Sequence, residues 1–251
     1  MRMPLVVGNW KMNTNVEQAV GLAKEVSDLT HAIDQVTKVI CPPYVSLEPI
    51  KKALAGTKLH VGAQNLHPEP SGAFTGEVSV HMLSGLVEFA IVGHSERRNI
   101  FGESDDTVAS KVIAAAAHKI RPIVCVGEST NQRDSGNAID LVKQQLFASL
   151  NGCQDWTRLI VAYEPLWAIG TDKAASPEIA QEMMGSIRKA IVSKAGSRAG
   201  EALTLLYGGS VKSGNARSFF EQQDIDGALV GGSSLSAVEF SEIIKRAEHV
   251  D

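Results

Sequence analysis

A carboxylate follows one of the most apolar runs of the chain. The stretch RLIVAYEPLWAIGTDKAA, from Arg158 to Ala175, places Glu164 directly after that run. The proline, the tryptophan and the small, polar segment that come next suit a lid, with a firm hinge and a tip that fits around a ligand. A carboxylate at the root of a lid is open to substrate and is desolvated on closure, which raises its basicity. The pattern indicates a general base, with a surface ion pair as the alternative.

A histidine occupies a comparable position earlier in the chain. His94 follows an apolar run and precedes SERR, which reads as the start of a helix. Because the amino terminus of a helix disfavours the imidazolium form, we expect a neutral ring that donates a hydrogen bond at neutral pH. A histidine with a purely structural role is the alternative.

Two glycine pairs suggest an anion site. Gly208-Gly209-Ser210 and Gly231-Gly232-Ser233 each follow an apolar run. Glycine lets the backbone approach a ligand closely, and the start of a following helix offers unpaired N–H groups, so we expect a phosphate to bind there. Lys11 would add a positive charge and Asn9 a neutral donor. Taken singly, each of these features could instead be a flexible turn or a solvated surface group.

Short apolar runs that could position these residues recur along the whole chain. They are Leu5–Val7, Lys38–Cys41, Leu59–Ala63, Phe89–Val92, Pro122–Val126, Leu159–Ala162, Thr204–Tyr207 and Ala228–Val230. Nearly continuous apolar runs are typical of parallel strands that are covered on both faces. Eight repeats in 251 residues average roughly 31 each, the length of a strand with its crossover helix.

Helical patterns separate these runs. Ile179, Met183, Ile187 and Ile191 recur four apart, after Ser176 as a candidate cap and Pro177 in the first turn. An open doubly wound sheet would carry a GxGxxG or GxxxxGK[ST] loop, and the sequence has neither. No linker or low-complexity tract divides the chain. We therefore predict an α/β fold, a (β/α)8 TIM barrel of eight parallel strands each followed by a helix, as a single domain over residues 1–251, with the chemistry at the carboxyl ends of the strands.

Composition narrows the class of partner. The net charge of −4 and the pI near 6.0 provide no basic surface for nucleic acid or anionic lipid, so a small-molecule partner is expected.

Three cysteines cannot all pair, and the amino-terminal stretch lacks the apolar segment of a signal peptide, so we expect a cytoplasmic protein. No run of 18 apolar residues predicts a membrane span. Neither HExxH nor CxxC occurs, and we expect no metal and no cofactor.

Several longer motifs support a family assignment. They are GNWKMN (8–13), GAFTGE (72–77), VGHSERR (92–98), VCVGE (124–128), AYEPLWAIGT (162–171), YGGSV (207–211) and VGGSSL (230–235). Together, and in this order along the whole chain, they closely resemble the triosephosphate isomerase family. The resemblance implies a cofactor-free aldose–ketose isomerase of glycolysis and gluconeogenesis, which interconverts dihydroxyacetone phosphate and D-glyceraldehyde 3-phosphate through an enediolate.

The resemblance also assigns roles within the site. Glu164 matches the general base and His94 the neutral electrophile that polarises the carbonyl. Lys11 and Asn9 match the groups that stabilise the developing negative oxygen. The phosphate-binding positions that it implies are Gly170, Ser210, Gly231 and Gly232. The supporting positions are Ser95, Glu96, Glu128 and Tyr207, of which Tyr207, together with Ser210, matches the latch of the closed lid.

The lid itself carries two departures from the family. By resemblance it comprises Pro165, Leu166 and Trp167 as first hinge, Ala168, Ile169, Gly170 and Thr171 as tip, then Asp172, and Lys173, Ala174 and Ala175 as second hinge. The family usually has glycine at position 172 and often threonine at position 174. Aspartate tolerates positive φ better than most residues, so we expect Asp172 to shift the balance between open and closed lid without preventing closure.

Leu66–Glu77, the loop around Thr75, resembles the segment through which the family forms dimers, and so a homodimer is implied. Two other functions remain open at this point. One is a class I aldolase-type barrel acting on sugar phosphates with a Schiff base on Lys11, which borohydride reduction with substrate would trap. The other is a non-catalytic barrel that binds phosphorylated metabolites.

Overall fold

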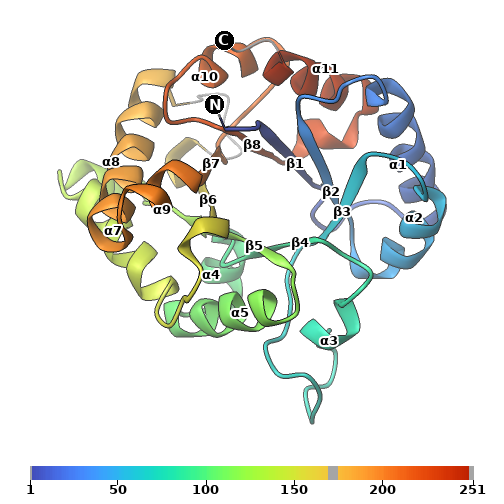
Figure 1. Cartoon of the computed structure of the whole chain (residues 1–251), viewed down its shortest axis with the longest axis horizontal. Helices are drawn as coiled ribbons and strands as arrows, with labels where there is room; N and C mark the ends of the chain where they lie inside the picture. The colour runs from blue at the N-terminus through green and yellow to red at the C-terminus, as the bar shows by residue number, and fades with distance from the viewer. Residues whose placement is uncertain (1, 169–174, 249–251) are drawn as a thin grey trace.

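Eight parallel strands form a closed barrel in the computed structural model, which describes residues 2–168 and 175–248. Each strand pairs with the next, and β1 closes the sheet against β8 (Figure 1). The strands are β1 (Leu5–Asn9), β2 (Thr37–Cys41), β3 (Leu59–Ala63), β4 (Phe89–Val92), β5 (Arg121–Val126), β6 (Ile160–Tyr163), β7 (Thr204–Tyr207) and β8 (Gly227–Val230). The prediction of a (β/α)8 barrel is confirmed.

Helices surround the sheet (Figure 1). They are α1 (Val16–Thr30), α2 (Leu47–Ala53), α3 (Val80–Leu83), α4 (Ser95–Phe101), α5 (Asp105–Ala117), α6 (Thr130–Asp134), α7 (Ala138–Ser149), α8 (Pro177–Ala195), α9 (Ser197–Ala202), α10 (Ala216–Phe220) and α11 (Ala237–Glu248). Short 3₁₀ turns span Tyr44–Ser46, Trp156–Arg158, Leu166–Ala168 and Gly232–Leu235. Within the described ranges, none of the helices is both long and apolar enough to cross a membrane.

The strands end later than the apolar runs in two places that matter for the site. β1 continues to Asn9, which pairs with Cys41 of β2, and β6 ends at Tyr163, which pairs with Tyr207 of β7. Backbone hydrogen bonds between the strands set these ends, and such bonds form whether the side chain is polar or apolar. Asn9 therefore belongs to its strand, and Glu164 is the first residue beyond β6.

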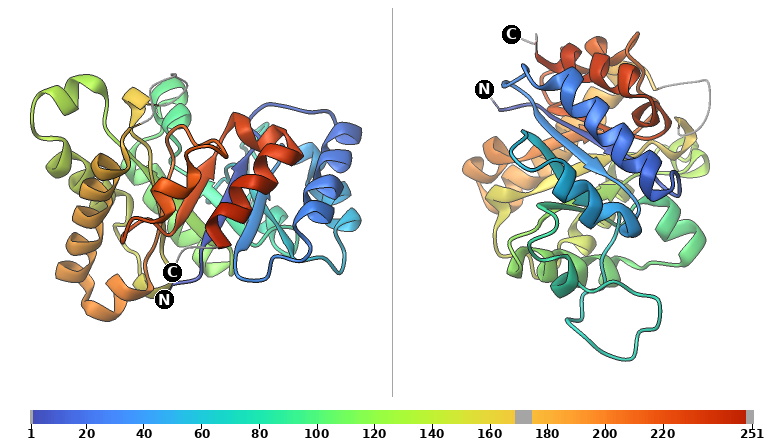
Figure 2. Two further views of the ribbon diagram at one scale, coloured as in Figure 1. Left: turned by 90° about the horizontal axis from the view of Figure 1, so that it is seen from above. Right: turned by 90° about the vertical axis from the view of Figure 1, so that its right-hand side faces the viewer.

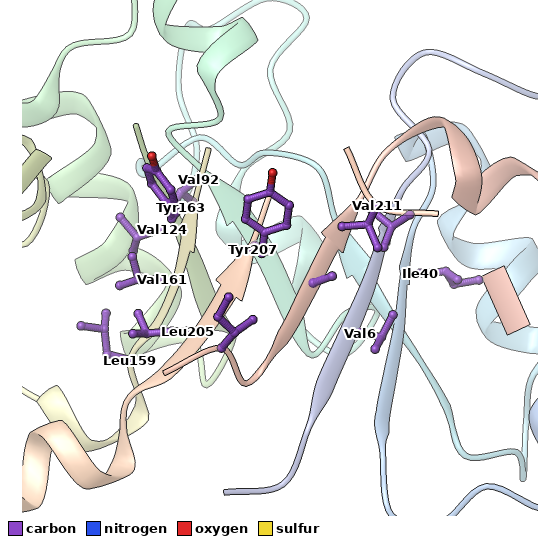
Figure 3. Packing of buried hydrophobic residues seen from close by; sticks show 14 of the residues in the cluster. Val6, Ile40, Val92, Val124, Leu159, Val161, Tyr163, Leu205, Tyr207 and Val211 are labelled. Carbon is purple, nitrogen blue, oxygen red and sulfur yellow. The ribbon is translucent and has the colours of Figure 1, made fainter. Parts of the chain in front are cut away.

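Alternation along the strands divides the core in two. Inward-facing side chains fill the barrel; they are Leu5, Val7, Val39, Cys41, Phe89, Ile91, Ile123, Cys125, Ile160, Ala162, Leu206 and Leu229. Outward-facing side chains, including Val161 and Tyr163 of β6, pack with the helices (Figure 3). Because Ile160 and Ala162 face inward, the same period of two brings Glu164 to the rim of the barrel interior.

α8 forms where the pattern predicted it. The Ser176 hydroxyl caps the helix by accepting from the backbone N–H of Ile179, and Pro177 occupies its first turn. Met183, Ile187 and Ile191 are buried against the barrel. This buried stripe makes α8 part of the apolar layer outside the barrel, where the helix packs against α7, α9 and α10.

The connection from β3 to α3 leaves the body of the molecule. It protrudes as a long loop at the lower edge of Figure 1 and in the right-hand view of Figure 2. Residues 69–77 at its end are exposed, whereas backbone hydrogen bonds from His67 to Val78 and from Val80 back to His67 close its base. The Phe74 ring packs on His67, with ring centroids 4.1 Å apart. The loop thus has its own internal contacts and little cover from the barrel.

Candidate active site

A cavity of about 280 Å³ opens among the carboxyl ends of β1, β4, β6, β7 and β8. Its lining residues are Asn9, Lys11, His94, Glu164, Gly208, Gly209, Ser210, Val211, Lys212, Leu229, Gly231, Gly232 and Ser233. Residues that the sequence analysis selected on separate strands are therefore neighbours here. Among residues 2–168 and 175–248, no group of three or more His, Cys, Asp or Glu side chains is arranged to hold a metal ion.

Glu164 is almost completely buried, with 2% of its surface exposed. Its Oε2 accepts the backbone N–H of Ser95 at 2.9 Å, and its Oε1 lies 2.9 Å from Nε2 of His94. Burial by itself raises the pKa of this carboxyl, but His94, the Ser95 N–H and Lys11 together lower it below its ordinary value. Glu164 is therefore held as a carboxylate by the groups around it.

His94 caps α4 with its own side chain. Its Nδ1 accepts the backbone N–H of Glu96 at 3.2 Å, so that nitrogen carries no proton and Nε2–H faces Glu164. Burial lowers the pKa of His94, but the Glu164 carboxylate, together with that of Glu96, raises it above its ordinary value. The expectation of a neutral ring from the helix end alone did not include this buried carboxylate. Once Glu164 moves away from the ring, burial and the Glu96 N–H both favour the neutral imidazole.

Lys11 has a left-handed backbone, with φ of 53°, directly after β1. Gln64 supports this conformation by donating to the carbonyls of Lys11 and Cys41, both at 2.8 Å. The Lys11 Nζ lies 2.5 Å from Oε1 of Glu96, and its Cε lies 3.6 Å from where a Cβ on Gly231 would be. The ammonium group is therefore held between α4 and the loop after β8. Gln64 was missed in the sequence, although it follows β3 at the same edge as the other site residues.

The two glycine pairs differ in what they make room for. A Cβ on Gly209 would lie 2.2 Å from the Tyr207 hydroxyl, and one on Gly208 would lie 2.9 Å from Cγ of Glu164. A Cβ on Gly232 would meet nothing within 4 Å, and one on Gly231 would meet only Lys11. The first pair therefore accommodates protein side chains, while the second leaves open cavity for a ligand.

The helix starts also differ from the expectation. After β8, a 3₁₀ turn begins at Gly232, so N–H groups at its start border the cavity. After β7, the next helix, α10, begins only at Ala216, six positions beyond Ser210. The prediction of a helix start directly after both strands is thus wrong for β7, where Asn215 instead donates to the Ser210 carbonyl at 3.2 Å.

Glu128 ties the root of the predicted lid to the end of β5. It is 1% exposed, and its Oε1 accepts from the Tyr163 hydroxyl at 2.9 Å, the Trp167 Nε1–H at 2.9 Å and Arg133 at 3.0 Å. Its carbonyl accepts the backbone N–H of Leu166 at 3.0 Å. One buried carboxylate thus holds the first hinge, and Tyr163 and Arg133 were not anticipated from the sequence.

The remaining lid residues are described only in part. Pro165 accepts the backbone N–H of Ala168 at 2.8 Å, and Ala168 and Ala175 are buried. Burial raises the pKa of the nearby Tyr207 to about 12, against a smaller opposite effect of the Ala175 backbone. The other predicted lid positions, Ile169, Gly170, Thr171, Asp172, Lys173 and Ala174, lie outside the described residues.

Arg98 positions the loop that carries His94. Its Nε donates to the Gly93 carbonyl at 2.7 Å, and its guanidinium also contacts Asp105 at 2.6 Å and the Cys125 carbonyl at 3.2 Å. It thereby links the ends of β4 and β5 beneath the site. Its place in the SERR motif was visible in the sequence, but its partners are distant along the chain.

Comparison with known proteins identifies the family. Residues 4–247 match the family model described as triosephosphate isomerase. The chain is 46% identical over 247 residues to a protein named triosephosphate isomerase from Alkaliphilus oremlandii (strain OhILAs), covering 97% of this chain and 99% of that protein. It is 42% identical to one of the same name from Clostridium perfringens (strain SM101 / Type A), with the same coverage. The chain therefore belongs to the triosephosphate isomerase family.

Proposed function

We propose that this protein interconverts dihydroxyacetone phosphate and D-glyceraldehyde 3-phosphate, with Glu164 as the base and His94 as the electrophile. The observation that carries the proposal is the 2.9 Å contact between these two side chains, in a cavity that Lys11 and the open Gly231-Gly232 loop also line. A base and a proton donor on one side and an anion site on the other are what a phosphorylated α-hydroxycarbonyl compound requires.

Substrate binding begins with the phosphate. The N–H groups at the Gly232 turn, where the backbone is unobstructed, receive its oxygens together with the loop at Ser210, which lines the same cavity. Lys11, held close to Gly231, adds a positive charge between the phosphate and the reacting carbons. Anchoring the phosphate orients the carbonyl toward His94 and Asn9, so the reacting groups are already in place and need not meet by diffusion.

Glu164 then transfers the proton. The carboxylate leaves Ser95 and His94, removes a proton from the carbon beside the carbonyl, and returns it to the neighbouring carbon. The electron pair of the broken C–H bond moves onto the carbonyl oxygen and forms an enediolate, which the Nε2–H of His94 and Lys11 stabilise. His94 passes protons between the two oxygens. A base contributes about 10² to 10⁴ in rate, and a fixed donor about 10² to 10³.

Lid closure would protect this intermediate. An enediolate with a phosphate on the adjacent carbon can expel the phosphate when it is held loosely or exposed to water. A lid that is hinged at Trp167 and anchored to Glu128 supports this role, because it joins the closing segment directly to the base.

An assay with each triose phosphate as substrate tests the proposal. We expect purified protein to convert glyceraldehyde 3-phosphate, and Glu164→Ala to lower the rate by about 10² to 10⁴. Glu221→Ala, which removes an exposed carboxylate that pairs with Arg217 and does not line the cavity, is the matched control and should leave the rate unchanged. The proposal fails if the protein does not convert the substrate, or if Glu164→Ala is folded and fully active.

We also propose a homodimer through the protruding loop around Thr75. Exposed apolar side chains support it: Met12 is 96% exposed, Phe74 45% and Met82 60%. Met12 adjoins the site residue Lys11, whereas Phe74 and Met82 lie on and just after the loop. A partner that covers these side chains would remove apolar surface from water close to the site.

A cytoplasmic location and a single domain over residues 1–251 complete the proposal. The location is supported by Cys41, Cys125 and Cys153, all of which are free. Burial raises the pKa of each thiol, which favours the unreactive protonated form. The domain assignment is supported by a sheet whose eight strands extend from Leu5 to Val230.

A further inference from the structure

A second cavity, of about 350 Å³, lies at the opposite end of the barrel from Glu164. Arg121, the first residue of β5, and Leu159, directly before β6, form its floor, whereas Glu164 follows the other end of β6. The last turns of α5 and the segment between α7 and β6 form its walls. α5 packs against both α7 and β5 (Figure 1), and the cavity lies beside the last turn of α5.

Arg121 and Arg158 line this cavity, and neither is in direct contact with a carboxylate among the residues that the structure describes. Among the described residues, Arg121 and Arg158 form no side-chain hydrogen bond or ion pair, and Arg121 rests over the Phe89 ring at 5.3 Å. Both residues line the same cavity, and burial, and then the charge of Arg158, lower the pKa of Arg121. An anion between them would offset the effect of that charge.

One carboxylate, that of Asp155, also lines the cavity, and its pKa is lowered first by its hydrogen bonds with Thr157 and also by the charge of Arg158. Oδ1 of Asp155 accepts both the backbone N–H of Thr157 at 3.0 Å and its hydroxyl at 2.6 Å. Lys119 lines the cavity as well, so three cations face a single anion there. The local charge remains positive on a protein whose net charge is −4.

The rest of the lining is mostly apolar. Ile113 of α5 is 47% exposed at the cavity, and Val112, Ala116 and Leu159 continue the same surface inward. A free inorganic anion would leave these side chains in contact with water. A ligand with an apolar body would cover them while its charged end reaches the arginines.

We propose that this cavity binds a small amphipathic anion, with an aromatic or alkyl body against Ile113 and Ala116 and one carboxylate, sulfonate or phosphate group between Arg121 and Arg158. The site is separate from the catalytic cavity, shares no lining residue with it, and does not depend on the proposed isomerase activity.

Fluorescence titration with 8-anilinonaphthalene-1-sulfonate tests the proposal on the full chain. We expect saturable binding of one molecule per chain that dihydroxyacetone phosphate does not displace. N-phenyl-1-naphthylamine, which has the same aromatic body without the sulfonate, should bind at least about tenfold more weakly, because charged hydrogen bonds carry a large share of such binding. Inorganic sulfate alone should compete only weakly, because it lacks the apolar body.

Two variants place the binding. Arg121→Gln/Arg158→Gln should weaken binding of the sulfonate by roughly tenfold or more, with little effect on the neutral probe. Ala116→Trp, on the exposed side of α5, should block both probes by filling the cavity. Arg217→Gln/Arg246→Gln removes the same charge from α10 and α11 and should leave binding unchanged. Wild-type far-UV circular dichroism and a cooperative thermal unfolding transition verify that each variant is folded.

The proposal is overturned if the arginine pair and Ala116→Trp leave sulfonate binding unchanged, which would place the probe on another apolar surface such as Met12 and Phe74. It is also overturned if dihydroxyacetone phosphate displaces the probe, or if the neutral and charged probes bind equally well.

Discussion

Oε1 of Glu164 lies 2.9 Å from Nε2 of His94, so the proposed base and electrophile are bonded to each other in this structure. His94 is the last residue before α4, and Glu164 directly follows β6, 70 positions later in the chain. The contact keeps the carboxylate charged and the ring oriented. In the proposed mechanism the base breaks this contact before it reaches a substrate carbon.

Shortening the base should separate turnover from binding. Glu164→Asp withdraws the carboxylate by one methylene, and a displacement of about 1 Å costs roughly 10² in rate. We expect kcat to fall by about that factor while the affinity for inorganic phosphate stays within about twofold, since the proposed phosphate contacts lie at the ends of other strands. Steady-state kinetics and a phosphate titration measure both. An unchanged kcat would refute the assignment of Glu164 as base.

The pair should give the protein a characteristic dependence of stability on pH. The pKa of Glu164 is below its ordinary 4.5, so its contribution is present above about pH 4.5 and is lost as the pH falls through the lowered pKa. The pKa of His94 is above 6.5, so its contribution is present below about pH 6.5 and is lost as the pH rises through the raised pKa. The unfolding free energy of wild type should therefore exceed that of Glu164→Gln most strongly between about pH 4.5 and pH 6.5.

Chemical denaturation at a series of pH values checks this window, at one protein concentration throughout. In parallel, NMR titration of His94 should give a lower pKa in Glu164→Gln than in wild type, because the raising charge is gone. Glu221→Gln is the control and should leave the His94 titration in place. A His94 pKa that is the same in wild type and Glu164→Gln would contradict the coupling.

Removing Glu128, which accepts several hydrogen bonds at the root of the proposed lid, should destabilise the fold more than removing one of the groups that donate to it. Glu128→Ala leaves the buried Tyr163 hydroxyl and the Trp167 N–H without their acceptor, at a cost of about 2–4 kcal/mol. Tyr163→Phe removes one donor and should cost about 1 kcal/mol. Urea unfolding compares the two. Equal losses would mean that Oε1 of Glu128 does not serve several donors at once.

The two glycine loops should respond differently to one methyl group. Gly209→Ala forces a Cβ to within 2.2 Å of the Tyr207 hydroxyl and should lower stability by about 1–3 kcal/mol. Gly232→Ala meets no protein atom within 4 Å, so the fold should be unaffected while inorganic phosphate binds more weakly. Thermal unfolding and phosphate titration separate the effects. Wild-type phosphate affinity in Gly232→Ala would remove that loop from the phosphate site.

Charge in the protruding loop should dissociate the proposed dimer. Thr75→Glu places a carboxylate where a partner would have to desolvate it, and we expect a monomer at micromolar concentration. Ser193→Glu, at an exposed position of α8, is the control and should leave the assembly unchanged. Analytical ultracentrifugation measures both. The dimer proposal fails if wild type is a monomer, or if Thr75→Glu assembles as well as wild type.

The barrel itself could be predicted because its signals are local. Apolar runs such as Phe89–Val92 and Thr204–Tyr207 coincide with β4 and β7, since burial on both faces demands uninterrupted apolar side chains. The ends of strands were less certain: β1 extends to Asn9 because backbone pairing continues past the apolar residues. The selection of Lys11, His94 and Glu164 followed from one further rule, that parallel strands present their carboxyl ends on one side.

Only the tertiary structure decided which atoms meet. The sequence by itself determined the elements and the edge at which the polar residues gather, because the periods of strands and helices are properties of neighbouring residues. Residues that are distant along the chain meet where Gln64 contacts the Lys11 carbonyl and where Arg98 contacts the Cys125 carbonyl. The raised pKa of His94 has the same origin, because it depends on the distant carboxylate of Glu164. Such contacts depend on barrel closure, register and the exclusion of water, which no local pattern specifies.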